Sequence, residues 1–317
     1  MKHTGILRAV EIQDHGLRHN SAIQASSLKP QAQWRSVLAV LLISLCGCDK
    51  CDKEQPGSDP GPSRLGNKES NLERILAAKV LKIGVRSDSP PFGYQDKDGN
   101  PAGFDVDLGF RLARSLGVQP VFVTVSSPER IERLKNGDVD LVIATLTATR
   151  RRAHEIDFSI PYFQDHQMLL VETSSAIQSY RDLSGKRVAA ALRSTSIDNL
   201  KVVAPDCEIV PVQSVAVGFE KLNSGAVDAL TGDGLVLQSF RLNAADPSKF
   251  RIAGEGFSVE PYVIGLPYND SQLRARVDEF LTEIWNSGVW TRLFNKWLGA
   301  QSPYNLEASF QMAVLPP

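Results

Sequence analysis

The chain alternates short apolar runs, typical of strands, with longer segments whose apolar side chains recur at helical spacing. The apolar runs predict strands at residues 80–86, 118–125, 140–144, 168–172, 187–191 and 208–211. The helical spacing predicts helices at residues 104–116, 126–137, 215–224 and 235–242. Gly117 ends the first predicted helix, and Pro128 lies in the first turn of the second. Such alternation predicts parallel sheets flanked by helices, with ligand groups at the carboxyl ends of strands.

The pattern of strands and helices restarts after Pro161. Two similar α/β units in one chain predict two lobes with a cleft between them. We therefore expect an α/β protein in which each lobe has a mostly parallel sheet flanked by helices.

The first residues have a different pattern. Residues 37–46, VLAVLLISLC, form an apolar run that is too short to span a bilayer comfortably and is typical of a signal-peptide core. The junction LCGC at 45–48 resembles a bacterial lipobox, which would place a lipid on Cys48. The alternative is a buried core helix, but the polar residues that follow continue such a helix poorly. We predict a lipoprotein signal peptide over residues 1–47.

A polar stretch rich in Pro, Gly and Ser follows the apolar run, and residues 48–69 are predicted to form a flexible tether. Cys46, Cys48 and Cys51 all lie at the junction. A zinc site there would need a fourth ligand and nearby histidine, so lipid attachment is favoured over metal binding. Only Cys207 lies in the body of the chain, so no internal disulfide is expected there.

The composition narrows the function. With 42% hydrophobic residues, 35 Lys and Arg and 36 Asp and Glu, it is that of a water-soluble globular protein, and it excludes a disordered or polytopic membrane protein. The net charge of -1 provides no basic field for nucleic acid. Removing residues 1–47 leaves 30 basic and 34 acidic residues, a charge of -4. The remaining histidines, His154 and His166, are too few for a histidine metal centre or triad.

Six segments are similar, in order and spacing, to the periplasmic solute-binding proteins of polar amino-acid ABC importers. They are RSDSPPFGY at 86–94, GFDVDL at 103–108, TATRRRAHEIDFSIPYF at 147–163, DLSGKRVAAALRSTS at 182–196, NSGAVDALTGD at 223–233 and SGVWTRLFNKWLG at 287–299. The resemblance covers roughly residues 70–300. It is nearest to the glutamate- and aspartate-binding branch, because of Arg86 and the segment SPERI at 127–131.

The resemblance implies a type II periplasmic-binding-protein clamp that closes on one amino acid. Lobe 1 would comprise residues 70–162 plus 262–300 and lobe 2 residues 168–258, with two hinge crossings and a C-terminal tail at 301–317. Such a protein needs no cofactor and docks, as a monomer, on an ABC permease in the inner membrane. It would work in the periplasm or at the cell surface, held to the membrane only by the lipid on Cys48.

Two residues are expected to hold the backbone groups of the ligand. Arg152 follows a predicted buried strand, and its planar guanidinium can hold an α-carboxylate through two parallel hydrogen bonds. Residues 150–152 are all arginine, and such a run usually faces solvent. Only the spacing to Phe158, as it occurs in the resembling family, singles out Arg152. Asp233 between two glycines is by itself typical of a turn, but the resemblance implies that it pairs with the α-ammonium group.

Further contacts are expected at the ends of strands in both lobes. Thr145 and Thr147 can offer hydroxyl or backbone groups to the ligand, or can satisfy their own loop. Ser194 and Thr195 precede a helix, whose free N–H groups attract anions, although simple N-capping is the alternative. The family usually has glycine where this chain has Arg193, so lobe 2 departs from the family pattern next to these contacts.

The resemblance implies that Arg86, Ser127 and Arg130 hold a side-chain carboxylate. On local sequence alone, Arg130 is an exposed helix residue and Ser127 a helix N-cap. However, these two arginines and Arg152 against one aspartate give the site a charge of +2, and a neutral ligand would leave buried charge unpaired. We therefore expect glutamate or aspartate. Glutamine and asparagine stay open, because Val215 stands where close glutamate and aspartate binders have histidine.

An enzyme on the same scaffold is the alternative function, since periplasmic cyclohexadienyl or arogenate dehydratases share this architecture. The sequence offers no clear acid or base for such chemistry, because His154 and His166 flank surface-like segments. We therefore predict a binding protein without catalytic residues, cofactor or metal.

Overall fold

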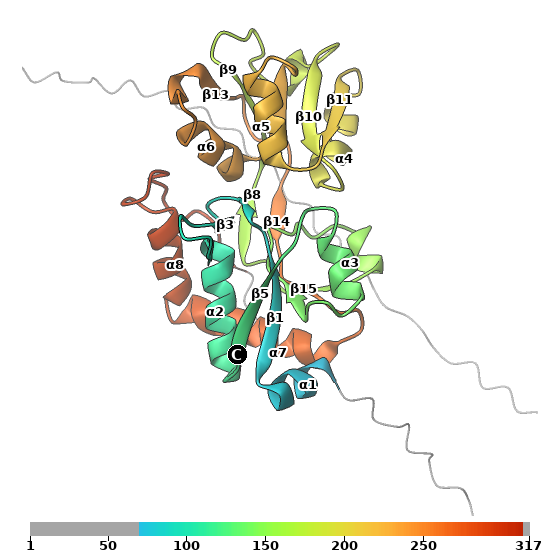
Figure 1. Ribbon diagram of the computed structural model, residues 1–317, viewed down its shortest axis with the longest axis vertical. Helices are drawn as coiled ribbons and strands as arrows, with labels where there is room; N and C mark the ends of the chain where they lie inside the picture. Colours follow the sequence, from blue (N-terminus) through green and yellow to red (C-terminus); the bar gives the residue numbers. More distant parts are fainter. Residues whose placement is uncertain (1–69, 313–317) are drawn as a thin grey trace, which may run out of the picture. The chain divides into compact units, whose positions relative to one another are not determined.

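The computed structural model describes residues 70–312 (Figure 1). The predicted signal peptide, Cys48 and the tether at 48–69 lie outside the described residues, as do residues 313–317. Within residues 70–312, none of the helices combines the length and the apolar character needed to cross a membrane. These residues form two five-stranded sheets with helices packed around each.

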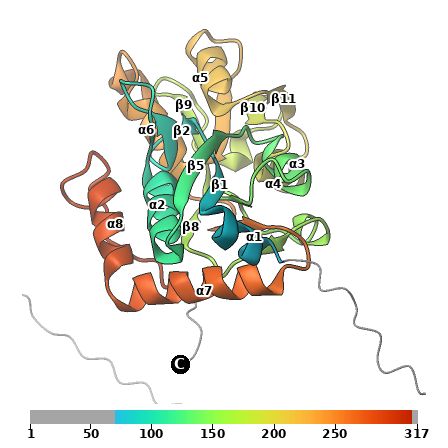
Figure 2. The ribbon, with the colours of Figure 1, turned by 60° about the horizontal axis from the view of Figure 1, so that its bottom comes forward.

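The first sheet has the strand order β5-β1-β6-β15-β7. Its strands are β1 (Val80–Val85), β5 (Gln119–Thr124), β6 (Leu141–Val142), β7 (Asp157–Phe158) and β15 (Gly265–Leu266). β1 is parallel to β5 and β6, whereas β15 is antiparallel to β6 and β7. The helices of this lobe are α1 (Asn71–Ala78), α2 (Phe104–Leu116), α3 (Arg130–Lys135), α7 (Ser271–Asn286) and α8 (Val289–Trp297). Figure 2 shows α8 following α7, with α2 beside them.

The second sheet has the strand order β11-β10-β12-β9-β13. Its strands are β9 (Gln167–Glu172), β10 (Arg187–Ala191), β11 (Glu208–Val212), β12 (Ala229–Asp233) and β13 (Phe250–Ala253). β10 is parallel to β11 and β12, and β9 runs antiparallel to β12 and β13. The helices of this lobe are α4 (Thr195–Val203), α5 (Val215–Asn223) and α6 (Gly234–Leu242).

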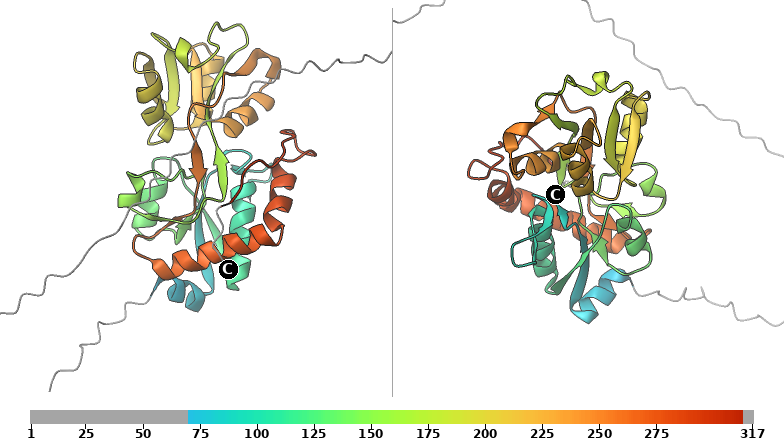
Figure 3. Two further views of the ribbon diagram at one scale, coloured as in Figure 1. Left: turned by 180° about the vertical axis from the view of Figure 1, so that it is seen from behind. Right: turned by 45° about the horizontal axis from the view of Figure 1, so that its top comes forward.

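Two short strands carry the chain from one sheet to the other. β8 (Phe163–Asp165) leads into the second sheet and β14 (Glu260–Tyr262) leads back, and the two pair antiparallel. Figure 3 shows them side by side. Asp165 is directly opposite Glu260 in this pairing, so two carboxylates face each other at the crossing.

The aromatic core of the first lobe fixes these crossing strands. The ring of Phe92 lies 5.1 Å from that of Phe163 in β8 and 5.2 Å from that of Tyr262 in β14. Trp290 is buried in the same cluster and donates from its indole nitrogen to the carbonyl oxygen of Tyr162, at 2.8 Å. Phe92 is therefore a core residue.

A small antiparallel sheet follows β1, and Phe92 lies in the connection between its first two strands. Its strands are β2 (Asp88–Ser89), β3 (Gly93–Gln95) and β4 (Pro101–Ala102). Gly103, the N-cap of α2, follows with a φ of 128°, and a Cβ there would lie 2.1 Å from the carbonyl oxygen of Phe92. Only glycine fits this position, because a side chain would clash with the backbone.

The described part of the predicted tail packs on the first lobe. The ring of Phe310 stacks 6.3 Å from that of Phe163, and its edge faces Trp285 at 6.1 Å. Met312 is buried. Residues 301–312 thus extend the aromatic core beyond α8.

The structure confirms the predicted α/β fold with two sheet-containing lobes. Several predicted elements have the expected bounds, among them the helix at 104–116 and the strand at 187–191. The helix predicted from Ser126 or Ser127 instead begins at Arg130. The Glu129 carboxylate accepts hydrogen bonds from the backbone nitrogen and the hydroxyl of Ser126, which holds residues 126–129 as a turn.

Candidate functional site

A cavity of about 30 Å³ lies where β1, β6, β10 and β12 reach their carboxyl ends. Eight of the nine predicted binding residues line it: Arg86, Ser127, Arg130, Thr145, Thr147, Ser194, Thr195 and Asp233. The lining comes from both lobes, because parallel strands of each sheet end here. The ninth residue, Arg152, does not line this cavity.

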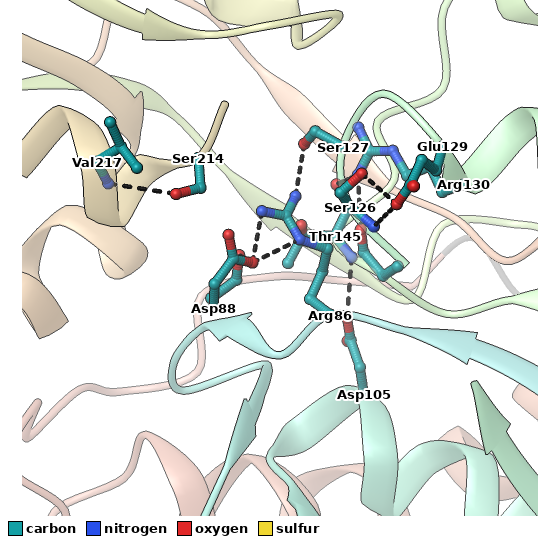
Figure 4. A network of polar contacts seen from close by, with 12 residues as sticks. Arg86, Asp88, Asp105, Ser126, Ser127, Glu129, Arg130, Thr145, Ser214 and Val217 are labelled. Atoms are coloured by element: carbon teal, nitrogen blue, oxygen red, sulfur yellow. Dashed lines mark hydrogen bonds and ion pairs between the residues drawn. The ribbon is translucent and has the colours of Figure 1, made fainter. Parts of the chain in front are cut away.

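Arg86 follows β1 directly and is only 4% exposed. It donates from Nη1 to the hydroxyl of Ser127 at 2.5 Å. Its Nε and Nη2 lie 2.8 and 2.6 Å from a single carboxylate oxygen, Oδ1 of Asp88, as Figure 4 shows. Asp88 thus compensates the charge of Arg86, and it was missed in the sequence because the turn around it gave no sign of which way it faced.

Arg130 is buried, with 3% of its surface exposed. Its Nη1 donates to the carbonyl oxygens of Ala144 at 2.6 Å and Thr145 at 3.0 Å, while its Nε has no hydrogen-bond partner among the described residues. Burial, followed by the charges of Arg152 and Arg86, lowers the pKa of Arg130. The simple interpretation as an exposed helix residue is therefore wrong, and the free Nε–H of this guanidinium can donate to an anionic or carbonyl oxygen.

Thr145 is held in a conformation that β-branched residues rarely adopt. Its φ is 45°, in the left-handed region. Its backbone nitrogen donates to Oδ2 of the fully buried Asp105 at 2.9 Å, and Oδ1 of Asp105 accepts from the hydroxyl of Tyr162 at 2.7 Å. Burial raises the pKa of Asp105 to about 6. These contacts fix the loop after β6 and hold Thr145 in its strained backbone conformation at the cavity wall.

Asp233 ends β12 and lies among other acidic groups. Its carboxylate accepts hydrogen bonds from the side-chain nitrogen of Gln167 and, at 2.7 Å, from the hydroxyl of Tyr262. Burial, together with the charges of Asp165 and Glu260, raises the pKa of Asp233 to about 7. It caps no backbone group of α6 with its side chain, so it is not a simple capping residue. A concentration of carboxylates of this kind favours a cation.

Ser194 and Thr195 stand at the start of α4, but their hydroxyls bind other protein groups. The Ser194 hydroxyl donates to the carbonyl oxygen of Ala191 at 2.6 Å, and that of Thr195 donates to Glu260 at 2.8 Å. Ser194 makes no side-chain capping bond. The first N–H groups of a helix have no hydrogen-bond partner within the helix. Those of α4 are therefore the donors that this side of the cavity can offer an anion.

Arg152 is buried and links the two lobes. Its Nη1 donates to the carbonyl oxygen of Thr147 at 2.7 Å and its Nη2 to that of Arg193 at 3.2 Å. With Ser127 and Arg193 it lines a neighbouring cavity of about 200 Å³. Arg193 has a φ of 53°, which explains why glycine suits this position. The neighbouring Arg151 is exposed, as predicted for the rest of the arginine run.

The affinity for an amino acid is expected to fall as the pH decreases below about 7. The pKa of Asp233 is raised to about 7, so below that pH its carboxyl group is neutral and pairs weakly with an ammonium group. For one such group the loss approaches about tenfold per pH unit. Calorimetric titration across the range from about pH 5 to about pH 8 measures this, with the melting temperature of the unliganded protein as the control. An affinity that stays constant over this range would contradict the role given to Asp233.

Comparison with known proteins identifies the family. The family model of bacterial extracellular solute-binding proteins, family 3, matches residues 81–300. A glutamine-binding protein of an ABC transporter from Bacillus subtilis is 32% identical over 272 residues, which covers 83% of this chain and 94% of that protein. An L-glutamate/L-aspartate-binding protein from Pseudomonas aeruginosa is 26% identical, and the match covers 76% of this chain and 84% of that protein.

A solved structure of an amino-acid-binding protein is also similar to this chain. An ancestral arginine-binding protein bound to glutamine matches with a TM-score of 0.67 and 34% identity, covering 70% of this chain and 98% of that one. The curated relatives are binding proteins, which confirms the prediction of a binding protein over an enzyme. This chain belongs to the bacterial extracellular solute-binding proteins of family 3.

Proposed function

We propose that this protein is the binding component of an amino-acid ABC importer and that its ligand is an L-amino acid of the glutamine and glutamate type. The family, the cavity between the lobes and the binding-protein relatives support this proposal. The amino acid is captured when the lobes close about β8 and β14, and it is then delivered to a membrane permease.

The observation that carries the proposal is the separation of charge across one small cavity. The buried guanidinium of Arg130, with no carboxylate partner among the described residues, lines it together with Asp233. Asp233 lies beside the carboxylates of Asp165 and Glu260, which leaves that end ready for a cation. An amino acid presents a cationic ammonium group and, a few bonds away, polar or anionic oxygens, so it satisfies both ends at once.

In this arrangement Asp233 binds the α-ammonium group and the start of α4 binds the α-carboxylate. Arg152 lines the neighbouring cavity, which shares Ser127 with this one, and joins the α-carboxylate when the lobes close on the ligand. Thr145 and Thr147 contribute from the loop after β6. Arg86, Ser127 and Arg130 surround the end of the ligand side chain. Ser194 and Thr195 belong to the α-carboxylate end.

The charge of the site supports an acidic ligand less strongly than the sequence suggested. The expected sum of +2 omitted Asp88, whose ion pair with Arg86 removes one positive charge, and it omitted Asp165 and Glu260 beside Asp233, which lower the sum further. The relatives include proteins named for glutamine and proteins named for glutamate. The proposal therefore covers both ligands. Anchoring through Cys48, a place in the periplasm or at the cell surface, and a monomeric state remain predictions.

A calorimetric and thermal-shift panel of amino acids on the purified protein tests this function. Glutamine or glutamate should stabilise the fold, by about 2.7 kcal/mol at a hundredfold excess over the dissociation constant. D-glutamine is the matched control, because it exchanges the positions of two groups on the α-carbon and should bind far more weakly. The proposal would be contradicted if only arginine or histidine gave a binding heat and a raised melting temperature, and glutamine and glutamate gave neither.

A further inference from the structure

We infer that Asp88 is a specificity-determining residue of this site, because it neutralises Arg86 and so favours the carboxamide of glutamine over the carboxylate of glutamate. The inference rests on the proposed function and names the ligand within it. Asp88 does not line the cavity itself and acts through Arg86, which does.

The geometry limits what Arg86 can offer a ligand. A guanidinium holds a carboxylate best through two N–H groups on one edge. In Arg86 the edge formed by Nε and Nη2 faces Oδ1 of Asp88, at 2.8 and 2.6 Å. Nη1 donates to Ser127 at 2.5 Å. Three of the five N–H donors of an arginine are thus used within the protein, as Figure 4 shows.

The remaining charge at this end of the cavity is that of Arg130 alone. Asp88 and Arg86 together carry no net charge, and Arg130 is the other arginine of this wall. Arg130 already donates to two carbonyl oxygens, and its charge also acts on the buried carboxyl group of Asp105. A ligand carboxylate placed here would be repelled by Asp88, whereas a carboxamide oxygen can accept from the arginines without bringing a charge.

The ion pair contributes more to ligand selection than to the fold. The side chain of Asp88 is 25% exposed, and single ion pairs that water reaches add little to stability. Its other hydrogen bond, from the hydroxyl of Ser89, is long, at 3.3 Å. Replacing Asp88 by asparagine keeps the size of the side chain, removes its charge, and leaves one oxygen that can still accept from Nε and Nη2 of Arg86.

The test compares calorimetric dissociation constants for glutamine and glutamate in the unaltered protein and in Asp88→Asn. We expect the unaltered protein to bind glutamine at least about tenfold more tightly than glutamate, and Asp88→Asn to shift this ratio by at least about tenfold toward glutamate. Asp88→Glu, which keeps the charge, should retain the preference for glutamine. Asp107→Asn is the matched control, because Asp107 is also in the first lobe, is 26% exposed and pairs with a cation, Lys296, away from this cavity.

Three results would overturn the inference. The first is tighter binding of glutamate than of glutamine by the unaltered protein, which needs no variant. The second is an unchanged ratio in Asp88→Asn, and the third is an equal shift in Asp107→Asn. In all three cases the protein still binds amino acids and the proposed function stands. If the unaltered protein binds no amino acid, the proposed function fails, and the role of Asp88 with it.

Discussion

Asp233→Asn is expected to weaken the binding of every L-amino acid by about 30-fold or more, since losing one partner of a buried charge pair costs about 2 to 5 kcal/mol. The variant removes the charge that pairs with the ammonium group. It also replaces one of the two carboxylate oxygens by an amide NH2, so that only one of the two donors, the side-chain nitrogen of Gln167 or the hydroxyl of Tyr262, keeps an acceptor. The effect should be equal for glutamine and glutamate, because both share the same ammonium group. Calorimetric titration with each ligand measures it.

The matched control for this variant is Asp228→Asn. Asp228 is in the same lobe and pairs with Arg187 at 2.9 Å, but its side chain is 33% exposed and it does not line the cavity. This control should bind within about twofold of the unaltered protein, since surface ion pairs have small effects. Near-normal binding by Asp233→Asn would show that the ammonium group lies elsewhere.

Arg152→Ala is expected to reduce affinity by about 100-fold or more for all amino acids. The variant removes the proposed partner of the α-carboxylate, which every amino acid carries. It also removes the bonds from one guanidinium to the carbonyl oxygens of Thr147 and Arg193, which connect the lobes. Arg152→Lys should restore little, because a single ammonium cannot reproduce the planar, two-pronged geometry.

Calorimetry with glutamine and a melting curve of the unliganded variant separate binding from folding. Arg151→Ala is the control, because Arg151 is the adjacent residue of the same run, is 65% exposed and lies 3.5 Å from Asp198 in an exposed ion pair. The control should bind normally. If Arg152→Ala folds and binds glutamine as tightly as the unaltered protein, then Arg152 has only the structural role seen in its carbonyl contacts.

Much of the fold could be predicted because the local signals agree with the final packing. Residues 104–116 form a helix as expected, since Gly117 adopts the left-handed conformation that ends it. The start of the next helix was misplaced, because Glu129 bonds back to Ser126 and holds a turn that the pattern did not reveal. The strand β12, Ala229–Asp233, was not predicted, because its last residues, TGD, resemble a turn.

The candidate site was predictable only in part, for a physical reason. Residues that follow strands at known spacing could be identified, and the cavity brings eight of them together. The groups that set their charge come from distant parts of the chain. Gln167 is 66 residues from Asp233, and Glu260 meets Asp165 only because β8 and β14 pair. Asp88 is close to Arg86 in sequence, yet only the turn geometry turns its carboxylate toward the guanidinium.

A crystal structure of the protein with glutamine tests the central claim most directly. The account predicts the ligand in the cavity between the lobes, with its ammonium group within hydrogen-bond distance of Asp233 and its side-chain end beside Arg86, Ser127 and Arg130. A ligand bound outside this cavity, or one whose ammonium group lies away from Asp233, would contradict it.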